Sequence, residues 1–158
     1  LQLQQERIMY GFPNAEGVFV SERQIPERHI AGFVTEFLNN FYNFAPESAV
    51  TNGNEALRMM SPRMRAAEEE GLKASAKQSV DQQITQVLVR TSPYTFEVDN
   101  KAGGYVVSFK AARYRATLNT VFDRKRYDIK LLIKAIKPSK HFEWAVVADD
   151  MDSQEIMQ

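Results

Sequence analysis

The sequence predicts an α+β domain in which three helices pack on one face of a strongly curved antiparallel sheet of about four strands. Two features of the pattern indicate this class. Large apolar residues near the start of the chain recur every three or four positions, as on one side of an α-helix, and from Ile84 onward apolar and polar residues alternate, as in strands. The chain has 158 residues, of which 44% are hydrophobic and 25% charged, which is ordinary for one domain with a sizeable core.

The first predicted helix spans residues 27–44. Ile25 and Pro26 open it, because proline is tolerated in the first turn of a helix, where its missing N–H would have no partner. Its large apolar side chains form one stripe, namely Ile30, Phe33, Val34, Phe37, Leu38 and Phe41. Such a stripe must lie on a broad apolar surface, and a sheet formed by the second half of the chain can provide it.

Two further helical segments follow. Residues 47–60 predict one or two short helices, interrupted by the Asn-Gly-Asn sequence at 52–54. Ser61 and Pro62 are a strong start signal for a third helix of roughly twenty residues, because they offer an N-cap hydroxyl and a proline at the first helical position. The predicted inner face of this helix consists of Met64, Ala67, Leu72, Ala76 and Val80.

The sheet half of the chain begins where the apolar period changes from about 3.6 to two. Residues 84–91 alternate around Val87 and Val89, which predicts a first strand. A Ser-Pro pair at 92–93 interrupts the pattern, so residues 94–98 either continue a bent strand or belong to a new one.

The next strand follows a turn predicted at residues 99–104. Its first apolar residues share one face, namely Tyr105, Val107 and Phe109. Farther along, the apolar residues fall in the other phase. In this phase Arg113 and Arg115 face outward, and the inward side chains are Ala112, Tyr114, Ala116 and Leu118. A β-bulge near Ala111 explains this slip, because one extra residue reverses the facing and bends the strand. The sheet is therefore predicted to be strongly curved.

Two more strands complete the predicted sheet. Residues 126–137 show the cleanest alternation, with an inner face made of Tyr127, Ile129, Leu131, Ile133 and Ala135. Residues 141–148 alternate again, with inward side chains Phe142, Trp144 and Val146. We expect one domain over residues 26–150, an irregular lead-in at residues 1–25, and a flexible acidic tail at residues 151–158.

The sequence contains no motif typical of catalysis, of a metal site or of a cofactor site. There is no cysteine, and the two histidines, His29 and His141, are predicted on polar faces of their elements. A P-loop, a dinucleotide-binding glycine pattern and a zinc-binding histidine pair are all missing from the sequence. We therefore predict a protein that is not an enzyme, with no catalytic residues, no cofactor and no metal.

The charge of the chain is unevenly distributed, although the net charge is zero. Residues 101–140 hold eleven Lys and Arg and two acids, which gives +9, whereas residues 141–158 carry −5. Such a basic block can contact nucleic acid, an acidic partner or anionic lipid headgroups. The alternative is a solvated sheet face whose charges pair with acids on neighbouring strands. The candidate contact residues are Arg113, Arg115, Arg124, Lys125, Arg126, Lys130 and Lys134.

Two stretches of the sequence carry a resemblance to a known family. They are FVTEFLNNFYNFAPESAVTNGNEALRMMSPRMRAAEEEGLK and FDRKRYDIKLLIKAIKPSKHFEWAVVADD. In the first, a helix, a loop, a second helix and a Ser-Pro start follow one another, and the second is the closing β-hairpin. The chain resembles the TraE-like proteins of bacterial conjugation, relatives of the eighth VirB component of type IV secretion systems. The likeness covers roughly residues 26–150.

This resemblance implies a fold like nuclear transport factor two, also described as cystatin-like, and a role without catalysis. The implied protein is a scaffold of the bacterial inner membrane, with this domain in the periplasm. Implied partners are further copies of the same chain, other secretion-system subunits and transferred DNA. The sequence begins at Leu1 and not at an initiator methionine, so we expect it to be part of a longer chain, and the resemblance implies a membrane-spanning helix upstream.

The chain departs from the family at one motif, and the fold leaves one alternative function open. The eighth VirB component carries Asn-Pro-x-Gly after its last strand, whereas Ala148 is followed here by three acids within four residues. The alternative is an enzyme of the isomerase type, or a protein that binds a small molecule, on the same cone-shaped fold. That alternative requires an inward carboxylate or histidine beside Tyr94, Tyr114 or Tyr127.

Overall fold

The computed structural model describes residues 25–137 and 144–157. Its contacts separate residues 1–30 from residues 31–158, and the boundary lies inside the first helix. In the described part of the first unit, the backbone N–H groups of His29 and Ile30 both donate to the carbonyl of Pro26, which begins that helix. Most of the predicted lead-in, residues 1–24, lies outside the described residues.

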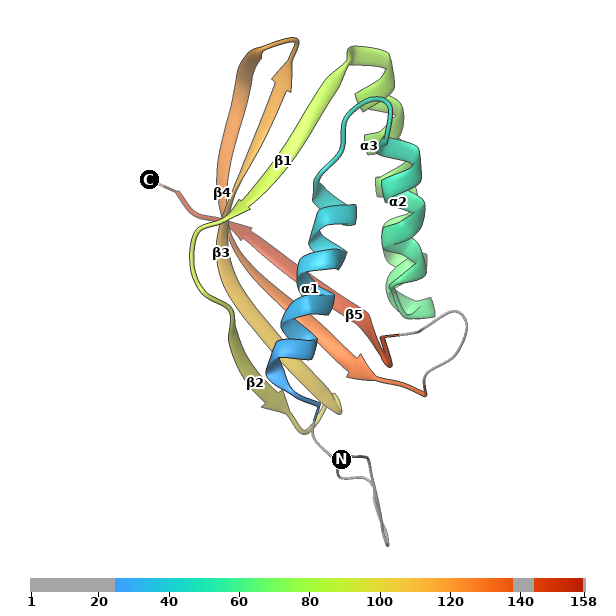
Figure 1. The fold of residues 1–158 in the computed structure, drawn as a ribbon, viewed down its shortest axis with the longest axis vertical. Coiled ribbons are helices and arrows are strands. Elements are labelled where there is room, and N and C mark those ends of the chain that lie inside the picture. The colour runs from blue at the N-terminus through green and yellow to red at the C-terminus, as the bar shows by residue number, and fades with distance from the viewer. Residues whose placement is uncertain (1–24, 138–143, 158) are drawn as a thin grey trace, which may run out of the picture. The chain divides into compact units, whose positions relative to one another are not determined.

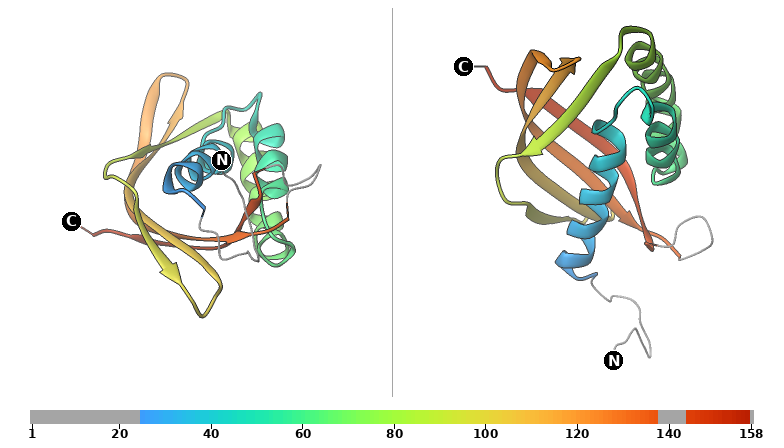
Figure 2. Two further views of the ribbon diagram at one scale, coloured as in Figure 1. Left: turned by 60° about the horizontal axis from the view of Figure 1, so that its bottom comes forward. Right: turned by 45° about the horizontal axis from the view of Figure 1, so that its top comes forward.

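The first helix, α1, spans Glu27–Tyr42, and its predicted apolar stripe is confirmed. Phe33, Val34 and Phe37 are fully buried. The Phe33 ring meets the indole of Trp144 edge-on, with centroids 5.9 Å apart. The sheet curls around the part of this helix that follows Ile30 (Figures 1 and 2).

The second helix, α2, spans Ala49–Arg58 without the interruption predicted at residues 52–54. Two contacts hold the Asn-Gly-Asn sequence in the helix. The amide of Asn52 donates to the Asn43 carbonyl at 2.6 Å, and Gly53 packs beside Leu72 of the next helix. Tertiary packing therefore overrides the low helix propensity of this sequence.

The third helix, α3, spans Pro62–Gln82, and its predicted start is confirmed. The Ser61 hydroxyl accepts the Met64 N–H at 3.2 Å, as an N-cap does. Its predicted inner face is only partly right. Met64 and Ala76 are buried, but Ala67 and Val80 are exposed. Near the end of the helix Ser79 takes the inner position, because its hydroxyl donates to the carbonyl of Ile84 at 2.6 Å.

The sheet has five antiparallel strands, one more than the number predicted. Their bounds are β1 Ile84–Arg90, β2 Thr95–Asp99, β3 Gly104–Thr117, β4 Thr120–Ala135 and β5 Val146–Glu155. The order is β1-β3-β4-β5, and β2 also pairs with β3, so β1 and β2 lie end to end along one edge of β3. The Ser-Pro pair at 92–93 therefore separates two strands.

The predicted bulge near Ala111 is wrong, because the β3–β4 register runs through that position without a break. The register shifts between Arg115 and Ala116, where Phe122 is the extra residue in β4. We call the side of the sheet that faces α1 the inner face and the other side the outer face. Because β3 keeps one phase, Arg113 and Arg115 lie on the inner face, and the outward facing predicted for them is also wrong.

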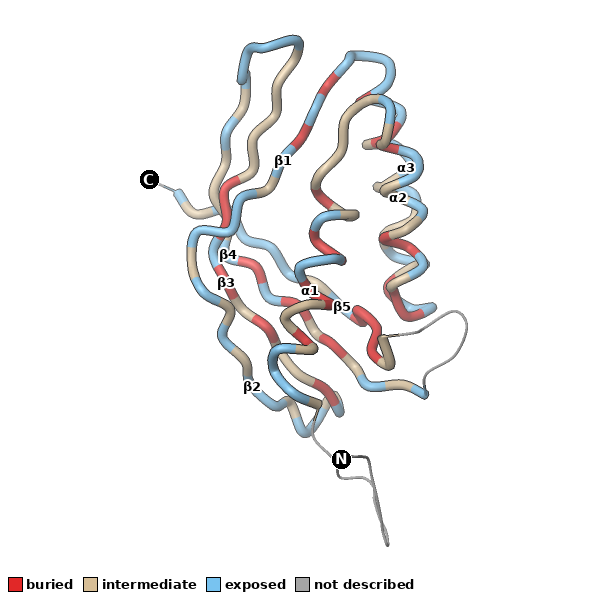
Figure 3. The backbone as a smooth tube through the Cα atoms, in the orientation of Figure 1, coloured by how far each residue is buried: buried red, intermediate tan, exposed pale blue. Residues whose placement is uncertain are grey.

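The facing of β1 is the opposite of what its apolar residues suggest. Ile84 and Gln86 are buried, whereas Val87 and Val89 are 41% and 47% exposed. The inner face of β4 agrees with the prediction at its centre, where three side chains are fully buried, namely Ile129, Leu131 and Ile133. Figure 3 marks the buried positions of the helices and strands in red along the backbone.

The last strand begins and ends later than predicted. Residues 151–155, assigned from the sequence to a loose tail, continue β5 because β4 offers backbone partners as far as Tyr127. Of the predicted strand, residues 141–143, with Phe142, lie outside the described residues. Trp144 packs on α1 but precedes the strand. Among the described helices, none combines the length and apolarity needed to cross a bilayer.

Candidate functional site

The seven basic residues singled out in the sequence lie on both faces of the sheet and form no single surface. The strand register places Arg113, Arg115 and Lys125 on the inner face. It places the remaining four on the outer face, namely Arg124, Arg126, Lys130 and Lys134. A partner that docks on one face therefore meets only part of the predicted set.

The inner face is polar at the end where β1 pairs with β3. The side chain of the buried Gln86 donates to the carbonyl of Tyr42 and accepts the Nε–H of Arg115, both at 2.9 Å. The backbone of Gln86 also exchanges two hydrogen bonds with Phe44. Desolvation, and then the nearby charge of Arg113, lower the pKa of Arg115. Gln86 thus joins the end of α1 to the sheet, which explains why an amide and not a valine faces inward.

Arg113 and Asp123 form the least exposed ion pair of this face. Their Nη2 and Oδ2 atoms are 2.9 Å apart, and the side chains are 13% and 28% exposed. The Arg113 guanidinium lies 5.5 Å from the centroid of the Tyr127 ring. Within the part of the chain that the structure describes, Nε of Arg113 is buried and has no hydrogen-bond partner. The pair was missed from the sequence because Arg113 was predicted to face outward and Asp123 precedes the strand predicted at residues 126–137.

The described part of the inner face carries an inward carboxylate, one of the groups that the small-molecule alternative requires. This carboxylate, Asp123, is held by Arg113, and Tyr114 lies on the outer face. The hollow next to Gln86 and Arg115 has a volume of about 10 Å³, which is at most the space of one water molecule. Among the described residues, no group of three or more His, Cys, Asp or Glu side chains could hold a metal ion.

The outer face is electrically mixed where β3, β4 and β5 meet. Nζ of Lys110 lies 2.6 Å from the Asp128 carboxylate, and Lys130 is paired in register with Asp152. These residues, with Ser92, line an open groove of about 490 Å³. In this part of the sheet Lys110 pairs with an acid on the neighbouring strand, as the alternative of a solvated face with paired charges requires.

At the other end of the outer face, large apolar side chains are exposed. The hairpin loop between β3 and β4 carries Leu118, 94% exposed, and Val121 and Phe122 follow at 57% and 53%. Beside them the Arg124 guanidinium lies 5.7 Å from the ring centroid of Tyr114. The signal in the sequence was the apolar pair Val121 and Phe122 just after the turn at Leu118 and Asn119. A reading based on apolar alternation alone places such residues in the core.

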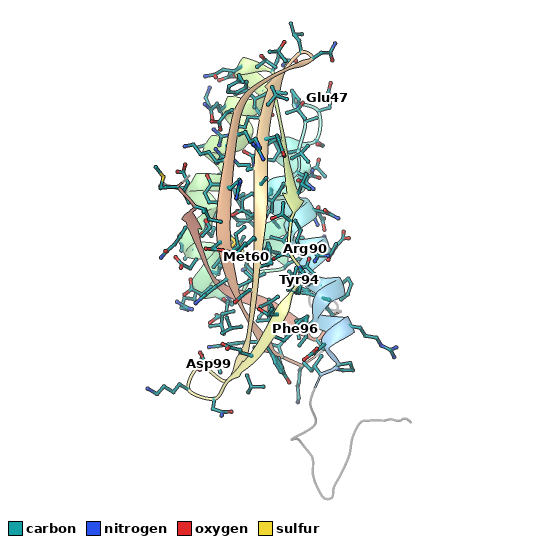
Figure 4. All side chains as sticks on the ribbon, turned by 90° about the vertical axis from the view of Figure 1, so that its left-hand side faces the viewer. Glu47, Met60, Arg90, Tyr94, Phe96 and Asp99 are labelled. Atoms are coloured by element: carbon teal, nitrogen blue, oxygen red, sulfur yellow. The ribbon has the colours of Figure 1, made fainter. Side chains whose placement is uncertain are left out.

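The corner between β1 and β2 is fixed by Tyr94 (Figure 4). Its hydroxyl lies 2.7 Å from Oγ1 of Thr35 on α1, and the Arg90 guanidinium lies 3.9 Å from its ring centroid. The rings of Phe96 and Phe109 both meet Tyr94 edge-on. An exposed and mainly polar corner is thereby tied to α1, so this tyrosine has a structural role.

A second charged cluster lies near the start of β5, at Asp149. Asp149 is the extra residue of a register shift between β4 and β5 and is 5% exposed. Its carboxylate lies 2.9 Å from Arg63 and 3.1 Å from Lys134. Burial raises the pKa of Asp149, but hydrogen bonds from Ser61, Arg63 and Lys134 outweigh it and lower that pKa to about 2. Sequence analysis missed this cluster because it predicted a strand end here.

Comparison with known proteins finds similarity in structure and none in sequence. No protein-family profile and no curated protein matches the chain. CagV, a VirB8 homologue of the type IV secretion system of Helicobacter pylori, matches with a TM-score of 0.68 and 8% identity, covering 82% of this chain and 99% of CagV. An IcmL-like type IV secretion protein of Legionella pneumophila matches with a TM-score of 0.71 and 12% identity, covering 86% of this chain and 97% of the IcmL-like protein. The periplasmic domain of DotI matches with a TM-score of 0.67 and 7% identity, covering 85% of this chain and 99% of that domain.

These similarities establish the fold. Each match extends over nearly the whole of the other domain, including the helices and the sheet. The predicted fold class, three helices on a curved antiparallel sheet of the nuclear-transport-factor-two type, is confirmed. The resemblance to relatives of the eighth VirB component is likewise confirmed in the structure.

Proposed function

We propose that this chain is a scaffold subunit of a type IV secretion or conjugation system and acts through contacts with other proteins. The observation that carries the proposal is the structural match to secretion-system proteins over 82% to 86% of this chain. At identities of 7% to 12%, such a match concerns the fold, so the function rests on the consistency of the neighbours. CagV and the IcmL-like protein are both type IV secretion proteins.

A role without catalysis agrees with the chemistry of the inner face. Its core is filled by apolar side chains that are fully buried, and its inward carboxylate, Asp123, is bound to Arg113. A general acid or base would need a free carboxyl group beside a cavity that admits a substrate. The described hollow beside this cluster holds at most one water molecule.

The proposed location is the periplasmic side of the bacterial inner membrane, with a membrane-spanning helix upstream of residue 1. The similarity to the periplasmic domain of DotI supports this location. Proposed partners are further copies of this chain and other secretion-system subunits. Contact with transferred DNA through the basic residues is also proposed. Of the seven basic residues, Arg124 and Lys130 on the outer face are exposed, so they are the more accessible part for a long ligand.

The experiment is a transfer assay in cells that carry the gene together with its secretion system. Deletion of the gene should abolish transfer of the cargo, and the full-length gene should restore it. As a matched control, Glu36→Ala changes an exposed residue of α1 and should restore transfer fully. Normal transfer in the deletion strain would contradict the proposed function.

A further inference from the structure

The hairpin formed by β3 and β4 extends past its neighbouring strand on one side. Thr117 pairs with Thr120, so the loop contains only Leu118 and Asn119. On the β5 side, pairing with β4 stops at Tyr127, and among the described residues no strand lies beside residues 120–125 (Figure 1). We call residues 117–122 the hairpin tip. It is a narrow, projecting end of the sheet.

Leu118 is an unfavourable residue for this position in the isolated domain. Its φ angle is +54°, a left-handed conformation that favours glycine, asparagine or aspartate in a two-residue hairpin loop. Its side chain is 94% exposed and therefore gains almost nothing from packing within the chain. A leucine that carries both costs is explained if its side chain is buried against something outside the chain.

Cations lie behind the apolar tip on both faces of the ribbon. Lys125 is on the inner face, and Arg124 and Arg126 are on the outer face. The nearby acid, Asp123, is already paired with Arg113. The tip thus presents exposed apolar side chains at its end and, two to four residues farther back, three cations that form no ion pair with the described residues.

We propose that the hairpin tip docks on an anionic lipid surface, with Leu118, Val121 and Phe122 entering the headgroup region. Apolar side chains at the very end and cations just behind them match the depth profile of such an interface. DNA would attract the cations but leave the apolar tip in water. A protein partner on one face would use the cations of that face only. A lipid surface can surround the tip and use both sets.

The experiment measures sedimentation of the protein with vesicles of phosphatidylethanolamine and phosphatidylglycerol, and with neutral phosphatidylcholine vesicles. We expect binding to the anionic vesicles alone. Leu118→Asn should weaken this binding by roughly tenfold, because binding then no longer transfers an apolar leucine side chain from water into the lipid surface. The melting temperature should stay the same or rise, since asparagine tolerates a positive φ better. Leu118→Phe should retain binding.

Matched controls separate the tip from general apolarity and charge. Val98→Asn removes a 59% exposed valine from β2 and should leave vesicle binding unchanged. Arg124→Glu should weaken binding by at least about fivefold, whereas Lys101→Glu, with the same change in net charge at a distant exposed turn, should have little effect. The emission of Phe122→Trp, corrected for Trp144, should shift to the blue on anionic vesicles.

Three results would overturn the proposal. The first is no binding to anionic vesicles. The second is binding that Leu118→Asn leaves unchanged and that does not shift the emission of Phe122→Trp, which would indicate adsorption by charge elsewhere. The third is binding of a DNA duplex that depends on Arg124 but not on Leu118, without vesicle binding, which would assign the cations to nucleic acid.

Discussion

Phe37 occupies the centre of the apolar stripe of α1. It is fully buried, and its ring lies 6.4 Å from that of Phe33 and 5.5 Å from that of Phe41. We expect Phe37→Ala to lower the free energy of unfolding by about 3 to 5 kcal/mol, because it removes buried apolar surface and leaves a cavity. Urea denaturation measures this change. Glu36→Ala, exposed on the same helix, should change stability by no more than ~0.5 kcal/mol. A cost below about 1 kcal/mol for Phe37→Ala would mean that the helix packs with another face.

Single polar residues decide the facing of the strands on the inner side. Gln86 is buried because its amide satisfies the carbonyl of Tyr42 and the guanidinium of Arg115 at once. Arg113 is nearly buried because Asp123 lies diagonally opposite. Buried polar groups are acceptable when they are hydrogen-bonded, and here their partners come from distant parts of the chain. Hydrophobic alternation cannot reveal such partners.

At the scale of elements, the end of α3 offers a test of backbone conformation. Gln83 follows the helix with φ 57° and ψ 48°, the left-handed conformation that usually carries glycine at a helix end. We expect Gln83→Gly to raise the free energy of unfolding by ~0.5 kcal/mol, since the relief of the left-handed strain exceeds the entropy that glycine adds to the unfolded chain.

The control for this substitution is the preceding residue. Gln82 is the last residue of α3, so Gln82→Gly should lower stability by up to about 1 kcal/mol. Thermal or urea unfolding of the two variants compares them directly. If both glycines destabilise equally, the left-handed conformation at Gln83 is not the one that the helix end adopts.

The elements that the sequence predicts well are those whose determinants are local. The stripe of α1, the Ser-Pro start of α3 and the inner face at the centre of β4 depend on spacing and capping within one segment. The facing predicted for β1 and for the later half of β3 was wrong, because in these segments apolar side chains lie on the outer face and polar side chains on the inner face. The basic residues were found by composition, but their division between two faces follows from register, which the sequence does not disclose.

At the scale of the whole unit formed by residues 31–158, two short bridges join the helical layer to the sheet. Phe44 pairs with Gln86 of β1, and Met60 pairs with Ala148 of β5. The second bridge has two backbone hydrogen bonds, from Ser61 to Ala148 and from Ala148 to the carbonyl of Met59. Asp149 follows immediately, so its carboxylate can meet groups from α3 and from β4. Asp149 thereby connects three elements.

Asp149 should make the stability of this unit depend on pH in the acid range. The pKa of its carboxyl is lowered from 3.8 to about 2, against the effect of burial, by hydrogen bonds from Ser61, Arg63 and Lys134. A lowered pKa in the folded state means that the stabilisation is complete above the unfolded value and is lost as the pH falls towards 2. The amount is about 2 kcal/mol, from about 1.4 kcal/mol for each pKa unit. Asp149→Asn should therefore lower the free energy of unfolding by about 2 kcal/mol near neutral pH, and the difference from the parent should vanish near the lowered pKa.

Urea denaturation of the variant and of the parent across this pH range measures the difference in stability. Taking the difference also removes the contribution of the other carboxyl groups, which titrate in both proteins. Asp150→Asn, at a side chain that is 65% exposed, should retain the pH dependence of the parent. An equal loss of stability on acidification in Asp149→Asn and in the parent would show that Asp149 does not connect the helices to the sheet in this way.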